Sequence, residues 1–129
     1  MRIIGHGIDI VEVCNVERLA RMPGGHFTTR CFTHRELRDA GEGTAKHERL
    51  AGRFAAKEAV AKAMGTGAGH GFAWTDIEIT TADSGAPGVV LRGGAQARAL
   101  ALGITGWLIS TSHGDHYAVA SAIALGHDG

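Results

Sequence analysis

The stretch RFAAKEAVAKAMGTG, residues 53–67, closes a long run rich in Ala, Leu, Glu, Lys and Arg, which are strong helix formers. The run predicts a helix from about Lys46 to Met64, and Gly65-Thr66-Gly67 predicts its end. Apolar residues recur along one side of this helix and define a stripe: Leu50, Ala51, Phe54, Ala55, Ala61 and Met64. We therefore expect this helix to lie against the core.

The segments before this helix predict a strand and two shorter helices. Residues 2–13 alternate as a strand does, with Ile4, Ile8 and Ile10 on one face and Gly5, Gly7, Asp9, Val11 and Val13 on the other. A short amphipathic helix should follow from Val13 to Ala20 and end at Pro23-Gly24-Gly25. The sequence Thr33-His34-Arg35-Glu36 is a capping box that should begin the next helix.

The segments after the long helix predict strands around one more helix. Residues 75–81 and 88–91 should form a hairpin through a turn at Asp83-Ser84-Gly85. Residues 95–102 predict a helix ended by Gly103, and residues 107–112 and 117–125 predict a second hairpin. The whole pattern indicates an α+β fold, a mainly antiparallel sheet wrapped around the long helix.

The composition limits what the chain can be. Its 129 residues fit one domain spanning positions 1–129, and its 13 basic and 13 acidic residues disfavour a nucleic-acid-binding protein. The sequence contains neither a signal-peptide pattern nor an apolar run long enough for a membrane span, and it has two cysteines without CxxC spacing. We expect no membrane association and a cytoplasmic location.

Glu58 falls within the apolar stripe of the long helix, where a carboxylate needs a cation or several donors. Lys62 follows it by four residues, the favoured spacing for a helical ion pair. An ordinary ion pair is the simpler interpretation of these two residues. A functional site is the alternative.

Asp9 supports the functional interpretation. It lies in a strand of apolar side chains and glycines, although strands disfavour aspartate, and Gly5 and Gly7 would permit a close approach to the backbone. A helix-capping role at the strand end is the alternative. Two semi-buried carboxylates and a lysine suit a magnesium ion on a phosphate-bearing substrate, with Asp9 and Glu58 as the metal ligands.

Further candidates have weaker signals. Arg53 and Lys57 are four residues apart and could form a cationic edge for phosphates, or a solvated helix face. Backbone amides at Gly65-Thr66-Gly67 could meet an anion, or simply end the helix. His113 and His116 have HxxH spacing, which is a weak zinc signal and one reason to consider a histidine-rich metal-binding protein as a rival.

The ordered motifs resemble those of a known family. The motifs are Gly7-Ile8-Asp9-Ile10-Val11-Glu12, then Phe32-Thr33-x-x-Glu36, then residues 53–67, then Gly85-x-Pro87 and Ser112-His113. Together they resemble holo-[acyl-carrier-protein] synthases, the short single-domain class of 4′-phosphopantetheinyl transferases. The resemblance covers nearly the whole chain, in the same order.

The resemblance implies an activity and a set of residue roles. The family transfers the phosphopantetheine of coenzyme A to a serine of an apo acyl carrier protein and releases adenosine 3′,5′-bisphosphate. By position, Asp9 and Glu58 would bind Mg²⁺, and Lys62 would neutralise charge on the coenzyme. Glu58 would be the base, directly or through a metal-bound water. The coenzyme pocket would hold these residues: Arg53, Lys57, Lys62, Gly65, Pro87, Ser112 and His113.

The resemblance also implies a homotrimer with sites between subunits, so that Pro87 would reach a neighbour's ligand. One position departs from the family pattern: basic residues often follow the first strand, where the acidic carrier docks, but this chain has Cys14 and Asn15. Arg18 and Arg21 follow a turn later. A specialised synthase for polyketide or peptide carrier domains is therefore one alternative, and a coenzyme-binding trimer without turnover is another.

Overall fold

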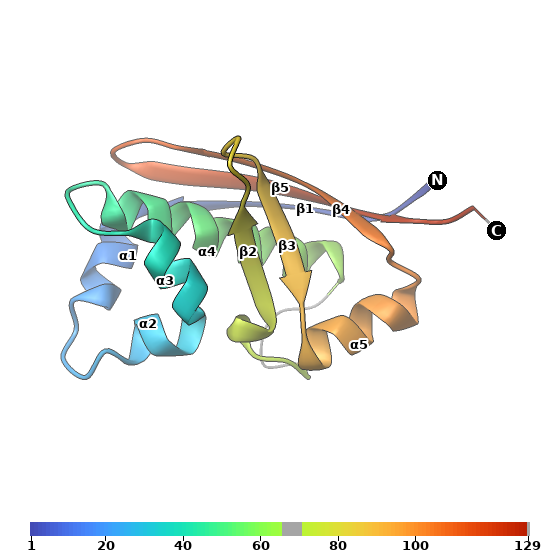
Figure 1. Ribbon diagram of the computed structural model, residues 1–129, viewed down its shortest axis with the longest axis horizontal. Helices are drawn as coiled ribbons and strands as arrows, with labels where there is room; N and C mark the ends of the chain where they lie inside the picture. The colour runs from blue at the N-terminus through green and yellow to red at the C-terminus, as the bar shows by residue number, and fades with distance from the viewer. Residues whose placement is uncertain (66–70, 129) are drawn as a thin grey trace.

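The computed structural model describes residues 1–65 and 71–128. A three-stranded antiparallel sheet and a two-stranded hairpin enclose the long helix α4, with three short helices at one end (Figure 1). The elements are β1 (Arg2–Glu12), α1 (Val13–Ala20), α2 (His26–Cys31), α3 (His34–Ala40), α4 (Lys46–Ala63), η1 (Trp74–Asp76), β2 (Ile77–Thr81), β3 (Pro87–Leu91), α5 (Gly93–Leu102), β4 (Gly106–His113) and β5 (Tyr117–Gly126). The predicted α+β class is confirmed.

Most predicted elements form close to their expected bounds. The capping box is present: the Thr33 hydroxyl accepts from the Glu36 backbone amide, and the Glu36 carboxylate accepts from the Thr33 amide. Two details were wrong. Helix α2 was not predicted, since six residues show too little periodicity. Thr75 and Asp76 belong to the 3₁₀ turn η1 and precede the strand.

Helix α4 lies directly on the inner face of the sheet, which has the strand order β1-β5-β4. The inner face is built from small residues: Gly5 pairs with Ala124 and Gly7 with Ala122. A Cβ atom at Gly7 would lie 2.0 Å from the Ala59 carbonyl oxygen, and one at Gly5 would lie 1.9 Å from that of Ala63. The close approach predicted at these glycines is therefore that of α4 itself.

The outer face of the same sheet is apolar and exposed. Ile8 and Ile10 are 58% and 63% exposed, and Leu108 on β4 is 57% exposed. Ile4 does not share this face, because a register shift between Ile3 and Gly5 lets it pack against the core. We call the exposed residues Ile8, Ile10, Leu108 and Tyr117 the outer sheet face; a monomer seldom leaves such a surface uncovered.

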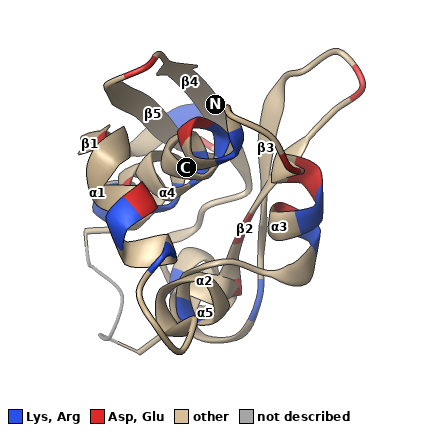
Figure 2. Ribbon diagram, turned by 90° about the vertical axis from the view of Figure 1, so that its left-hand side faces the viewer, with Lys and Arg blue, Asp and Glu red and all other residues tan. Residues whose placement is uncertain are grey.

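The three short helices form a second core with the N-terminal half of α4. Phe27 packs edge-on against Phe32 and Phe54, and Phe54 lies 5.5 Å from Trp74 between ring centroids. Both signs of charge occur on α1 and α3 (Figure 2). Among the described residues, no helix is long and apolar enough to cross a membrane.

Candidate active site

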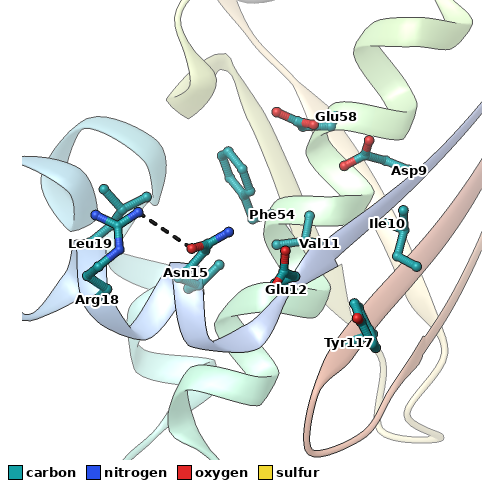
Figure 3. A pocket seen from close by; sticks show the side chains of 11 residues that line it. Asp9, Ile10, Val11, Glu12, Asn15, Arg18, Leu19, Phe54, Glu58 and Tyr117 are labelled. Atoms are coloured by element: carbon teal, nitrogen blue, oxygen red, sulfur yellow. Dashed lines mark hydrogen bonds between the residues drawn. The ribbon is translucent and has the colours of Figure 1, made fainter.

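Asp9 and Glu58 lie side by side at the edge of a cavity of about 420 Å³ between β1, α1 and α4. Their carboxyl groups face each other across the gap between strand and helix (Figure 3). Asp9 points toward α4 because it occupies the inner face of β1, opposite Ala120. We call this cavity, which Phe54, Asn15 and Tyr117 also line, the carboxylate pocket.

Lys62 does not form the predicted helical pair with Glu58. Its ammonium lies 2.9 Å from Asp9 Oδ1 and donates to the Ile8 carbonyl at 3.0 Å. No ion pair joins Glu58 and Lys62 within residues 1–65 and 71–128. The close packing of β1 on α4 explains the difference, because it brings a second carboxylate within reach of the lysine.

The electrostatics of this pocket favour a cation. Burial first, and then the neighbouring Asp9 carboxyl, raises the pKa of Glu58 to about 7, while Lys62 acts in the opposite direction. Asp9 Oδ2 is buried and has no hydrogen-bond partner among the described residues. Two crowded carboxylates, one with an unpartnered oxygen, are the donor set that a hard divalent ion requires.

A second, smaller cavity of about 170 Å³ lies between α4, the β2–β3 hairpin and β4. Three predicted coenzyme-binding residues, Arg53, Pro87 and His113, meet here, together with Arg49 and Thr81. The Arg53 guanidinium donates to the Arg49 carbonyl at 3.1 Å and to the Thr81 hydroxyl at 3.3 Å. Its Nε is buried and has no hydrogen-bond partner in the part of the chain that the structure describes, and burial lowers the pKa of Arg53. We call this the cationic pocket.

Lys57 does not contribute to a cationic edge, because it is completely buried. Its ammonium lies 2.7 Å from Glu36 and donates to the carbonyls of Trp74 and Ile77. Glu36 also accepts from the Ile79 amide at 2.9 Å. Burial lowers the pKa of Lys57, and Glu36 opposes that shift. The pair connects α3, α4 and β2, so it is part of the core.

Two further predicted residues, Ser112 and Gly65, line neither pocket. Ser112 is on the outer face of β4, because side chains alternate along a strand and Thr111 and His113 face inward. Gly65 follows α4 with a φ of 77°, which suits a glycine that ends a helix. Thr66 and Gly67 lie outside the described residues.

Several pocket residues were not predicted from the sequence. Arg49 could have been found, since it precedes Arg53 by one helical turn. Tyr117 has no such signal, because only the pairing of β1 with β5 brings it to the pocket, whereas Asn15 reaches the pocket from α1, which directly follows β1. His113 and His116 do not form a metal cluster with other side chains: the described part of the chain contains no group of three or more His, Cys, Asp or Glu able to hold an ion.

Residues 5–122 match the 4′-phosphopantetheinyl transferase superfamily, and the chain belongs to this family. It is 45% identical over 124 residues to the holo-[acyl-carrier-protein] synthase of Desulforudis audaxviator, covering 96% of this chain and 94% of that protein.

Solved structures of the same class agree in fold. The synthase of Neisseria meningitidis superposes with a TM-score of 0.85 at 31% identity, over 96% of this chain and 99% of that one. The Bacillus anthracis synthase in complex with CoA (3′,5′-ADP) gives a TM-score of 0.79 at 33% identity, over 97% and 98% of the two chains.

Proposed function

We propose that the chain is a holo-[acyl-carrier-protein] synthase. It transfers the 4′-phosphopantetheine of coenzyme A to a serine of an apo acyl carrier protein and releases adenosine 3′,5′-bisphosphate. The observation that carries this proposal is the facing pair Asp9 and Glu58, in a chain that matches the family over residues 5–122. The coenzyme A complex of the Bacillus anthracis synthase supports the choice of donor.

The residues of the carboxylate pocket fit magnesium. Asp9 and Glu58 would hold it, and the unpartnered Asp9 Oδ2 is a suitable ligand atom. Mg²⁺ commonly binds through one or two carboxylates, with waters and substrate phosphates completing its shell. Bound there, it would neutralise charge on the pyrophosphate of the coenzyme.

The side chains around this position have separate tasks. Lys62 is 55% exposed and held by Asp9, so its ammonium can stabilise negative charge on the departing phosphate. A serine oxygen attacks the pyrophosphate phosphorus that bears the pantetheine, and the bond to the departing nucleotide phosphate breaks. Glu58 would take the serine proton, directly or through a water molecule.

The cationic pocket suits the other phosphates of the coenzyme. Arg49, Arg53 and His113 supply the donors, and two arginines in one small cavity favour an anionic ligand. Arg53 and Glu58 are five positions apart on α4, about 140° around the helix, so one coenzyme would not reach both pockets easily in a single chain.

A homotrimer resolves this separation. In a closed ring with head-to-tail contacts, the cationic pocket of one subunit can face the carboxylate pocket of the next. Pro87 would then touch the neighbour's ligand. The exposed outer sheet face provides an apolar surface for such an assembly. The family resemblance is the basis for proposing a cytoplasmic location.

The activity is tested by mixing the protein with magnesium, coenzyme A and a panel of apo carrier proteins, followed by mass spectrometry of each carrier. We expect the carrier mass to rise by one phosphopantetheine, and Asp9→Ala to abolish the rise without unfolding the protein. If every carrier keeps its mass while coenzyme A still binds, the protein is a coenzyme-binding member of the fold without turnover.

A further inference from the structure

Glu48 and His113 form a close pair beside the cationic pocket. Glu48 lies in the first turn of α4, and His113 is the last residue of β4, 65 positions later. The distance from His113 Nδ1 to Glu48 Oε1 is 2.6 Å, short for an N–H···O contact and characteristic of a charged acceptor. The Glu48 side chain is half-buried, at 22% exposure, and the His113 side chain is 38% exposed.

This contact determines where the imidazole carries its proton. An ionised carboxylate can only accept, so Nδ1 must be the donor, and Nε2 is the nitrogen that remains for a ligand. No hydrogen bond to Nε2 occurs within residues 1–65 and 71–128. Gly52 leaves room for the ring beside α4, because a Cβ at that position would lie only 3.4 Å from His113 Cδ2.

The geometry points to Glu48 as a positioning residue for His113. It holds the ring against α4 through Nδ1–H, and when the ring carries both protons Nε2–H can donate to a phosphate oxygen in the cationic pocket. Glu48 is not among the residues that line this pocket, whereas His113, Arg49 and Arg53 are. It therefore acts through the histidine and keeps its own negative charge behind the ring. This inference rests on the proposed binding of coenzyme phosphates in that pocket.

A purely structural role for Glu48 makes a different prediction. A carboxylate in the first helical turn also stabilises the positive end of the helix dipole. That role would change the free energy of unfolding and leave the histidine unaffected. The experiments below separate the two roles.

The kinetic test is a double-mutant cycle with Glu48→Ala, His113→Ala and the combined variant. Glu48→Ala should raise the KM for coenzyme A about tenfold, the loss expected for one charge-assisted hydrogen bond, with kcat changed less than twofold. In the His113→Ala background, Glu48→Ala should have no further effect on KM. Equal effects of Glu48→Ala in both backgrounds, or an unchanged KM, would overturn the inference. Glu42→Ala is the matched control, because Glu42 is 87% exposed and pairs with Lys46 rather than with the histidine.

A second readout requires no turnover and so does not depend on the transferase activity. Nitrogen NMR of protein labelled in histidine should show His113 protonated at Nδ1 in the wild type. In Glu48→Ala the Nε2–H tautomer, which is intrinsically favoured in an unrestrained ring, should gain population, and Glu48→Gln should retain Nδ1–H in part. Identical His113 spectra in the wild type and Glu48→Ala would show that Glu48 does not set the tautomer.

Discussion

Neighbouring charged residues on α4 have opposite environments. Lys57 is sealed in the core with Glu36 and two carbonyls, and Glu58 borders the carboxylate pocket beside Asp9. The burial of Lys57 is tolerated because each of its protons has an acceptor, and losing Glu36 alone would leave an uncompensated charge. One residue step on a helix is a rotation of about 100°, which is enough to separate a core residue from a site residue.

The raised pKa of Glu58 predicts how stability depends on pH. The pKa is 4.5 in the unfolded chain and about 7 in the folded protein, so the folded state binds the extra proton between these values. Stability of the metal-free protein should therefore fall as pH rises through this window and stay constant below it. The loss is about 1–2 kcal/mol, after a discount for the partial exposure of the carboxyl.

Urea denaturation of metal-free wild type and Glu58→Gln at several pH values measures this loss. The difference in unfolding free energy between the two proteins should change across the window, with the variant gaining relative stability toward pH 7. Magnesium should oppose the decline in the wild type, since a metal ligand must be ionised. Parallel stability curves for the two proteins would show that Glu58 titrates normally.

At the scale of elements, the contact between β1 and α4 decides the geometry of the site. The glycines and alanines of the inner sheet face let the helix approach until Lys62 meets Asp9. A larger residue in this contact would move the helix and the Glu58 carboxylate away from the strand. The same packing thus builds the core and sets the spacing of the two carboxylates.

Gly7→Ala tests this contact. The added methyl group would lie 2.0 Å from the Ala59 carbonyl oxygen, which is backbone and cannot rotate aside. We expect a loss of stability of about 3 kcal/mol or more, or a misfolded protein, and strongly reduced transferase activity in any folded fraction. Gly106→Ala on β4 is the control, because a Cβ there meets no atom within 4 Å. Equal melting temperatures for the two variants would contradict the close packing.

Sequence patterns were sufficient for most of the elements, though not for α2, and for one half of the site. The caps, the helix periodicity and the strand alternation are local signals, and they placed Asp9 and Glu58 in partly buried positions correctly. The partners of each charge are not local. Lys62 pairs with Asp9 and not with Glu58, which is closer in the sequence, and Lys57 pairs with Glu36 inside the core. Tertiary packing determines these partners, because it decides which groups lose water and which charges come within reach.

At the scale of the whole molecule, predicted site residues divide between two cavities on different sides of α4. The predicted metal ligands Asp9 and Glu58 line the carboxylate pocket, and three predicted coenzyme residues line the cationic pocket: Arg53, Pro87 and His113. The outer sheet face borders the carboxylate pocket through Ile10 and Tyr117, and it has no partner within the described chain. The proposed trimer would explain both the separate cavities and the exposed apolar face. In it, an apolar contact between subunits would bring the cationic pocket of one subunit to the carboxylate pocket of the next.

Leu108→Glu tests the trimer. A charge on the outer sheet face should dissociate three copies of the 13.4 kDa chain into monomers and abolish transfer, because the joined site is lost. Leu100→Glu on α5 is the matched control, as Leu100 is 69% exposed but lies on a helix away from that sheet. Light scattering gives the mass of each variant. A monomeric wild type with full activity would eliminate the shared-site explanation.

The burial of Lys57 also has a practical consequence. The chain has three lysines, Lys46, Lys57 and Lys62, and only Lys57 is completely enclosed. An amine-directed acylating reagent should therefore label two lysine side chains in the folded protein and three once the core opens. Intact-mass spectra taken over time would then follow opening of the α3–α4–β2 core, because Lys57 is an internal reporter that requires no added probe.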